Sequence, residues 1–122
     1  MLVWIALGGA AGSVLRYLLG GAAQRTSGAA FPVGTFLVNV TGCFLIGVLS
    51  QHYMNTQTHP HMRAALITGF CGGYTTFSAF SLETTALIQG GEYGKAGLYV
   101  VLSVTLSLAA TFAGIAAARA AV

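Results

Sequence analysis

The sequence predicts an all-α integral membrane protein, and three observations support this fold class. Hydrophobic residues make up 56% of the chain and charged residues 6%, whereas a soluble domain carries about 25% charged residues. The mean hydropathy is strongly positive, at +0.79. The apolar residues form long continuous runs instead of an alternating pattern, which argues against a membrane β-barrel. The same composition excludes a disordered chain.

Four segments are long and apolar enough to cross a bilayer, which takes about 20 mostly apolar residues. They cover residues 2–21, 33–53, 62–88 and 96–118. Short polar or glycine-containing segments connect them, so we expect a single transmembrane domain over residues 1–122. No basic region precedes the first segment, so we expect it to be a membrane span and not a cleaved signal peptide.

The basic residues are too few and too dispersed to form a nucleic-acid-binding surface. They lie in nearly equal numbers on the two sides of the predicted bundle. The excess of basic residues on one side, which sets the orientation of most membrane proteins, is therefore missing. Either the chain has one weakly specified orientation, or it inserts both ways and forms an antiparallel, dual-topology homodimer. We favour the homodimer, because four short spans cannot easily enclose a solute pathway. The basic residues are Arg16, Arg25, Arg63, Lys95 and Arg119.

The third predicted span contains a sequence that disfavours a continuous helix. Two glycines, Gly72 and Gly73, are followed closely by two β-branched residues, Thr75 and Thr76, and both residue types weaken a helix interior. We therefore expect a break near the membrane midplane, with a simple glycine-tolerant kink as the alternative. A break frees backbone groups that lipid cannot satisfy. Freed carbonyls suit a small cation, and freed N–H groups suit an anion.

Polar side chains recur on one face of two other spans. Thr35 and Asn39 lie one turn apart in the second span. In the fourth span the hydroxyls of Tyr99, Ser103 and Ser107 follow one another at helical spacing. Asn39 either makes an interhelical hydrogen bond or donates to a ligand. The hydroxyls either bond to carbonyls of their own helix or form a polar track with Thr35 and Asn39.

The segment after the predicted break carries two phenylalanines and further hydroxyls. Phe77 and Phe80 share a helix face. They either pack against lipid or protein, or turn their electropositive ring edges toward an anion. Ser81 and Thr84 continue the polar character of this helix.

Glu83 is the only acidic residue in a predicted span. Inserting such a residue at the centre of a membrane helix costs on the order of 3 kcal/mol, so a specific role is expected. Glu83 lines a vestibule, carries a proton, or pairs with Arg16. The sequence does not separate these three roles.

Glycines are frequent within the predicted spans. Gly8 and Gly12 form a GxxxG pattern in the first span, and Gly42 and Gly47 lie in the second. Small residues let membrane helices approach closely. We expect close helix packing, consistent with a compact oligomer.

The remaining reactive residues give no sign of catalysis. Cys43 and Cys71 lie in apolar runs without metal-binding spacing, so we expect them to be small buried hydrophobic side chains. His52, His59 and His61 lie in or beside one polar segment, where solvation explains them better than weak metal binding. The sequence shows no pairing of a nucleophile with a base, no phosphate-binding loop and no zinc motif, so we do not expect an enzyme.

Three stretches of the chain resemble the Fluc (CrcB) family of small fluoride channels. They are GGAAGSVLRY at 8–17, FPVGTFLVNVTGCFLIG at 31–47 and GFCGGYTTFSAFSLE at 69–83. With the four predicted spans, the resemblance covers essentially the whole chain. It implies an antiparallel homodimer in the cytoplasmic (inner) membrane of a prokaryote, with two fluoride pores and a central structural sodium ion. Such a channel lowers cytoplasmic fluoride by passive efflux through the lipid bilayer.

The resemblance also implies roles for individual residues. Asn39 matches the family's pore asparagine, and Phe77 and Phe80 match the two phenylalanines whose ring edges contact fluoride. The carbonyls of Gly72 and Thr75 match those that bind the sodium ion, from both subunits. The other candidate pore residues are Thr35, Ser81, Thr84, Tyr99, Ser103 and Ser107, with Arg16 and Glu83 near the pore.

Two other functions are compatible with a small membrane protein of this size. A small multidrug-resistance exporter is also short and dual-topology, but it depends on a membrane glutamate in the first span. The first span here contains none, and Glu83 lies in the third. A structural subunit without transport activity would not explain the broken helix or the polar track.

Overall fold

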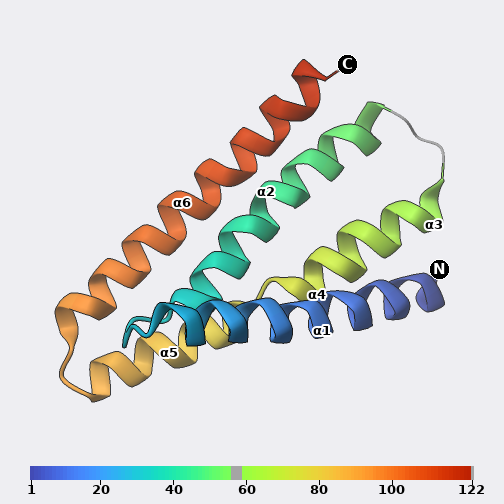
Figure 1. Cartoon of the computed structure of the whole chain (residues 1–122). Coiled ribbons are helices and arrows are strands. Elements are labelled where there is room, and N and C mark those ends of the chain that lie inside the picture. The colour runs from blue at the N-terminus through green and yellow to red at the C-terminus, as the bar shows by residue number, and fades with distance from the viewer. Residues whose placement is uncertain (56–58, 122) are drawn as a thin grey trace.

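The computed structural model describes residues 1–55 and 59–121, and over these residues it is entirely helical apart from short connections. The all-helical prediction is therefore confirmed for the described part of the chain. Figure 1 shows the long helices α1, α2 and α6 as extended rods, with shorter helices between α2 and α6. In chain order they are α1 (Leu2–Ser27), α2 (Val33–Asn55), α3 (Pro60–Arg63), the π-helix η1 (Ala64–Cys71), α4 (Gly72–Tyr74), α5 (Phe77–Gln89) and α6 (Tyr93–Ala120).

Helix α1 continues past the end predicted at residue 21, as far as Ser27. The polar residues predicted to form a connection are its last turns. Gly28 ends the helix in the left-handed conformation, with φ 60°, which glycine adopts without steric cost. The Gln24 side chain then fixes the turn, because it donates to the Phe31 carbonyl at 3.0 Å and accepts from the Gly34 N–H at 3.0 Å.

Helices α2 and α6 lie side by side along most of their length (Figure 1). Glycines make this contact close. A Cβ atom at Gly47 would clash with the Thr111 carbonyl oxygen, and one at Gly114 would clash with the Phe44 carbonyl oxygen. The backbones therefore touch where the two helices cross, as expected for small residues between membrane helices.

The predicted break in the third segment is present, and it falls at the threonine pair. Gly72 and Gly73 remain helical in α4, whereas Thr75 (φ −84°, ψ 154°) and Thr76 (φ −148°, ψ 116°) are extended. Extended backbone suits β-branched side chains, which lose rotamer freedom in a helix. Thr76 then begins α5 as its N-cap, since its hydroxyl accepts from the Ala79 N–H at 3.1 Å.

The glycines of the GxxxG pattern in α1 pack against another helix of the same chain. A Cβ atom at Gly8 would clash with the Ala65 carbonyl oxygen, and one at Gly12 would clash with the Phe70 carbonyl oxygen. Both carbonyls belong to η1, which packs along α1. The close approach expected from these glycines therefore joins α1 to η1.

Within the described residues, the three helices α1, α2 and α6 are long and apolar enough to cross a membrane. Their surfaces carry many exposed large apolar side chains, including Leu2, Tyr17 and Phe112, as expected for helices that face lipid or a partner. The segment from α3 to α5 is interrupted at residues 75–76, so the prediction that it forms a fourth span stays a prediction.

The polar segment in or beside which we expected His52, His59 and His61 covers residues 55–61. It lies partly outside the described residues, since residues 56–58 are not among them. His59 and His61 are exposed at the start of α3. The His61 ring lies 5.9 Å from the Trp4 ring of α1, measured between centroids. Within the described residues no group of three or more potential metal-binding side chains is found.

Candidate functional site

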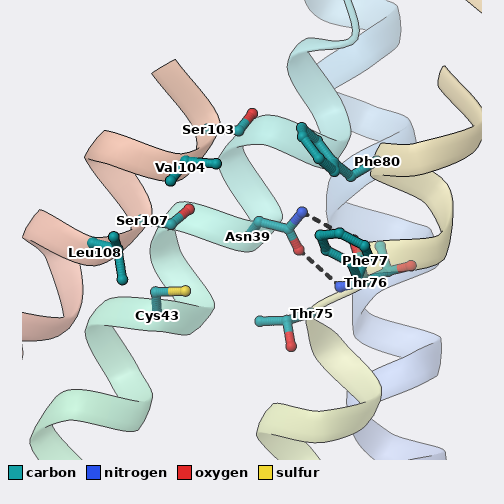
Figure 2. A pocket seen from close by; sticks show the side chains of 10 residues that line it. All are labelled: Asn39, Cys43, Thr75, Thr76, Phe77, Phe80, Ser103, Val104, Ser107 and Leu108. Carbon is teal, nitrogen blue, oxygen red and sulfur yellow. Dashed lines mark hydrogen bonds between the residues drawn. The ribbon is translucent and has the colours of Figure 1, made fainter. Parts of the chain in front are cut away.

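The break between α4 and α5 opens onto a pocket of about 310 Å³, which we call the aromatic pocket. Its walls come from α2, the break, α5 and α6 (Figure 2). Five of the predicted pore residues meet there, although they are far apart in the sequence. The lining residues are Asn39, Cys43, Thr75, Thr76, Phe77, Phe80, Ser103, Val104, Ser107 and Leu108.

The Asn39 amide holds the break in place through two hydrogen bonds to one residue. Its Nδ2 donates to the Thr76 carbonyl at 3.0 Å, and its Oδ1 accepts from the Thr76 N–H at 2.8 Å. Both bonds are drawn in Figure 2. The interhelical hydrogen bond predicted as one alternative is thus present. An amide nitrogen carries two hydrogens, so one N–H of Asn39 remains for a ligand.

The aromatic rings form a continuous row beside Asn39. The centroids of Phe77 and Phe80 are 5.5 Å apart, those of Phe80 and Tyr99 are 5.1 Å apart, and Phe31 meets Tyr99 edge-on at 5.3 Å. Phe77 is 79% exposed, so one side of this row is open within a single chain. The ring edges of Phe77 and Phe80 are available to the pocket.

The hydroxyl stripe of α6 faces inward. Tyr99 is fully buried, Ser103 is 7% exposed, and Ser107 is half-buried. Ser103 Oγ is the one buried side-chain oxygen or nitrogen among the described residues that has no hydrogen-bond partner. The alternative that this hydroxyl bonds to its own helix is therefore wrong for Ser103. An unpaired buried hydroxyl costs about 1–3 kcal/mol, which a ligand or water would relieve.

Glu83 joins Tyr99, at the N-terminal end of the hydroxyl stripe, to Thr35 of α2. The Thr35 hydroxyl donates to Glu83 Oε1 at 2.7 Å, and the Tyr99 hydroxyl donates to Glu83 Oε2 at 2.8 Å. Both carboxylate oxygens thus have donors from other helices, which offsets part of the cost of burying the acid.

Of the three roles left open for Glu83, the pairing with Arg16 is not observed, since no ion pair joins the two side chains in the described part of the chain. Arg16 Nε instead donates to the Gly73 carbonyl at 3.1 Å, because the break leaves that carbonyl without its helical donor. Arg16 and Glu83 nevertheless line a common space of about 310 Å³, which we call the charged pocket. Its other lining residues are Tyr17, Gly20, Gly21, Gln24, Arg25, Gly34, Thr35, Val38, Thr76 and Ala79.

Two further candidate residues do not line the aromatic pocket. The Thr84 hydroxyl donates to the carbonyl of Phe80 on its own helix at 2.7 Å. Ser81 is exposed on the surface of α5. Their assignment to a pore stays a prediction.

The break also exposes the two carbonyls predicted to bind a cation. The Gly72 carbonyl loses the donor that a continuous helix would supply, because the Thr76 N–H donates to Asn39. The Thr75 carbonyl loses its donor in the same way, because the Ala79 N–H donates to the Thr76 hydroxyl. Gly72 is exposed, and a Cβ atom there would meet nothing within 4 Å. These oxygens have the chemistry that a small hard cation requires.

From the sequence we did not expect Cys43 to line a pocket, or Thr76 to cap a helix and bond to Asn39. Cys43 lines the aromatic pocket one turn beyond Asn39, a placement that its spacing of four residues could have suggested. Thr76 forms the N-cap of α5 and contacts Asn39. A threonine before a new helix is a recognised capping signal.

Together, the apolar helices and two pockets that hold polar side chains beside an interrupted helix define a class, the multi-pass membrane proteins with polar groups within the helical bundle. The particular family follows from sequence comparison. Residues 3–115 match the family model described as CrcB-like protein, Camphor Resistance (CrcB). The chain belongs to this family.

Curated relatives extend over nearly the whole chain. Proteins named fluoride-specific ion channel FluC from Rhizobium etli (strain ATCC 51251) and Rhizobium meliloti (strain 1021) are 52% and 53% identical over 117 residues, covering 95% of this chain and 94% of each relative. The protein of the same name from Caulobacter vibrioides (strain NA1000 / CB15N) is 50% identical over 121 residues, covering 97% and 94%. The chain is a multi-pass integral membrane protein of the bacterial inner membrane.

Proposed function

We propose that this chain forms a fluoride-selective channel that lets fluoride leave the cytoplasm passively. The relatives bear the name of such a channel. The structural observation that carries the proposal is the unpaired Ser103 hydroxyl in the same pocket as the free N–H of Asn39. Both are neutral donors without an acceptor among the described residues, and a small anion would accept from both. Since the relatives are named as channels, we propose no catalytic activity.

The pocket is suited to an anion that must be stripped of water without being trapped. Burying a carboxylate-sized ion costs on the order of 20 kcal/mol by the Born estimate, and fluoride is smaller. Several weak donors can replace its water shell, whereas a buried ammonium would hold it too tightly. The amide of Asn39, the hydroxyls of Ser103 and Ser107, and the ring edges of Phe77 and Phe80 supply such donors.

A route through the chain would connect the two pockets. Arg16 at the charged pocket attracts the anion from water, and the carboxylate of Glu83 limits how strongly it is held there. Thr76 lines both pockets, so the ion would pass this residue to reach Asn39. The Tyr99 hydroxyl, held by Glu83, begins the stripe that Ser103 and Ser107 continue.

The pore would be completed by a second copy in antiparallel orientation. No residue of α5 is buried within one chain, and Phe77 is 79% exposed beside the pocket. A partner would cover this face and exclude lipid from the aromatic row. Two copies would then give two pores.

A sodium ion fits the carbonyls at the break. The Gly72 and Thr75 carbonyls, each without a helical donor, would hold it together with the same pair from the partner. The ion would supply positive charge that stabilises the four oxygens where the two copies meet. Exchange of sodium for N-methylglucamine would then increase the monomer fraction in detergent, as measured by light scattering, and an unchanged fraction would argue against the site.

The exporter alternative has no observation in its favour. Such carriers need a carboxylate in the first span, and α1 contains no acidic residue. The one acid within the predicted spans, Glu83, accepts two hydrogen bonds from neighbouring helices. We therefore propose no second function.

The test is fluoride efflux from liposomes that contain the purified protein. A fluoride electrode follows the efflux, valinomycin and a potassium gradient set the voltage, and a chloride gradient serves as the control for selectivity. Asn39→Asp places a carboxylate oxygen against the Thr76 carbonyl and puts a negative charge in the pocket. Phe80→Ile removes a ring edge.

We expect rapid fluoride efflux without chloride leak, and loss of efflux in both variants. A third variant, Thr105→Ser, changes an exposed residue of α6 whose hydroxyl bonds to its own helix, and it should conduct like the parent. Absence of fluoride efflux from well-folded protein would overturn the proposal.

A further inference from the structure

Cys43 places a thiol in the aromatic pocket. It lies on α2 one turn beyond Asn39, and its side chain points from α2 toward Thr75 in Figure 2. Cys43 is partly exposed, whereas the second cysteine, Cys71, is 1% exposed and does not line this pocket. The chain therefore holds one thiol that faces the pocket and one that is enclosed in η1.

A second observation indicates that the pocket which Cys43 lines can take a ligand. Ser103 is 7% exposed, and its Oγ has no partner among the described residues although it lines the same pocket. A buried hydroxyl is rarely left unpaired, so this one is available to a bound molecule. The pocket, at about 310 Å³, has room for a small group attached to Cys43.

We propose that Cys43 is a thiol-modification site, at which a small thiol-specific sulfur electrophile closes the aromatic pocket. The inference rests on the proposed function only for its effect on transport. The thiolate is the reacting form of a cysteine. With methyl methanethiosulfonate, the Cys43 thiolate attacks the sulfenyl sulfur, a new S–S bond forms, and the S–SO₂ bond breaks. Methanesulfinate leaves with the bonding electrons, and the thiol proton passes to water.

The product would obstruct the proposed route. A methylthio group on Cys43 would occupy part of the aromatic pocket, which Thr75 and Ser107 also line. It is apolar and lacks a hydrogen-bond donor, so it cannot replace the water that fluoride must lose. The methylthio group would block the route of fluoride one turn of α2 beyond the free N–H of Asn39.

The first measurement is the extent of labelling, which does not depend on transport. The parent chain, Cys43→Ser and Cys71→Ser are each reconstituted in liposomes, treated with methyl methanethiosulfonate at mildly alkaline pH, and weighed by intact-protein mass spectrometry. We expect one methylthio group on the parent and on Cys71→Ser, and none on Cys43→Ser. Equal labelling of both cysteines, or labelling of Cys71 alone, would overturn the proposed site. Cys43→Ala replaces Cys43→Ser if the latter fails to fold.

The second measurement is fluoride efflux from the same liposomes, with each protein compared with its own efflux before treatment. We expect the parent and Cys71→Ser to lose most of their efflux and to recover it after reduction with dithiothreitol. Cys43→Ser should keep its own starting efflux. Complete labelling of Cys43 without loss of efflux would overturn the closure of the pocket. If no protein conducts fluoride before treatment, the proposed function fails, while the labelling still decides whether Cys43 is accessible.

Discussion

The Asn39 amide serves the broken helix and the aromatic pocket at the same time. Its oxygen and one of its hydrogens satisfy the N–H and carbonyl of Thr76, and the second hydrogen is left over. If the amide were flipped, its NH₂ group would face the Thr76 N–H and its oxygen would face the Thr76 carbonyl, so both hydrogen bonds would be lost. The two bonds therefore fix the orientation of the amide. Asn39 therefore holds the break in place and also keeps one N–H as a donor for the aromatic pocket.

The Ser103 hydroxyl provides a residue-scale prediction, because stability and transport should respond differently to its removal. Ser103→Ala removes a buried oxygen that has no partner, so the apparent Tm in detergent should not fall. Fluoride efflux should fall by about tenfold or more, since a hydrogen bond to a charged group contributes about 1.5–3 kcal/mol. Thermal unfolding and liposome efflux are measured on the same preparation.

The matched control is Thr105→Ala on the same helix. Thr105 is exposed, and its hydroxyl donates to the Val101 carbonyl at 2.6 Å, so its removal should leave efflux unchanged. If Ser103→Ala conducts like the parent while Thr105→Ala also does, the Ser103 hydroxyl does not contact the ion.

The sequence predicted which polar side chains need a partner, because a polar group within an apolar span is costly to leave unpaired. Their partners were harder to predict. Opposite charge alone would pair Glu83 with Arg16. In the structure Arg16 donates to a carbonyl that the helix break leaves free, and Glu83 accepts from two hydroxyls instead. Partners depend on the three-dimensional arrangement of helices, which residue spacing along one helix does not contain.

The start of α5 provides a prediction at the scale of the element. Thr76→Val keeps the β-branched shape that suits the extended break but removes the hydroxyl that caps the Ala79 N–H. Loss of an N-cap costs about 0.5–2 kcal/mol, so the apparent Tm should fall. Thr85→Val on the same helix removes a hydroxyl that only bonds back to Ser81, and its Tm should stay near that of the parent. Equal Tm shifts in the two variants would show that the cap is unimportant.

The contact between α1 and η1 provides a second prediction at this scale. Gly12→Ala would push a methyl group into the Phe70 carbonyl, and overpacking of this kind costs about 1–3 kcal/mol. The variant should unfold at a lower temperature and elute earlier or aggregate in size-exclusion chromatography. Gly97→Ala is the control, since a Cβ atom at Gly97 in α6 meets nothing within 4 Å. A Gly12→Ala protein as stable as Gly97→Ala would contradict the close packing.

The long apolar helices could be predicted because lipid demands continuous apolar runs, whereas helix ends could not. Residues 24–30 suggested a polar connection, but a helix can continue past the apolar stretch until a residue such as Gly28 stops it. The break was predictable from Gly72 to Thr76, but its location at the threonines depended on Asn39, which lies on another helix. The π-helix had no signal in the sequence that we used.

One face of the molecule, formed by α5 and the helix break, is left exposed in a single chain. Helix α5 has no buried residue, Phe77 is 79% exposed, and the exposed Gly72 backbone carries an unsatisfied carbonyl. These features lie on or beside the break, so a second copy placed there would cover the aromatic row and the free carbonyls together. The nearly even distribution of basic residues permits the two copies to insert in opposite directions.

The last prediction concerns that insertion. C-terminal fusions to alkaline phosphatase, which is active outside the cytoplasm, and to green fluorescent protein, which is fluorescent inside it, should both give signal, as the proposed antiparallel dimer requires. One added charge should tip the balance. Ser27→Lys adds charge to the end opposite the C-terminus, and both residues changed here are exposed. It should raise phosphatase activity and lower fluorescence, and Ala120→Lys should do the reverse. A single active reporter that neither lysine shifts would show one fixed orientation, and the antiparallel dimer would then be excluded.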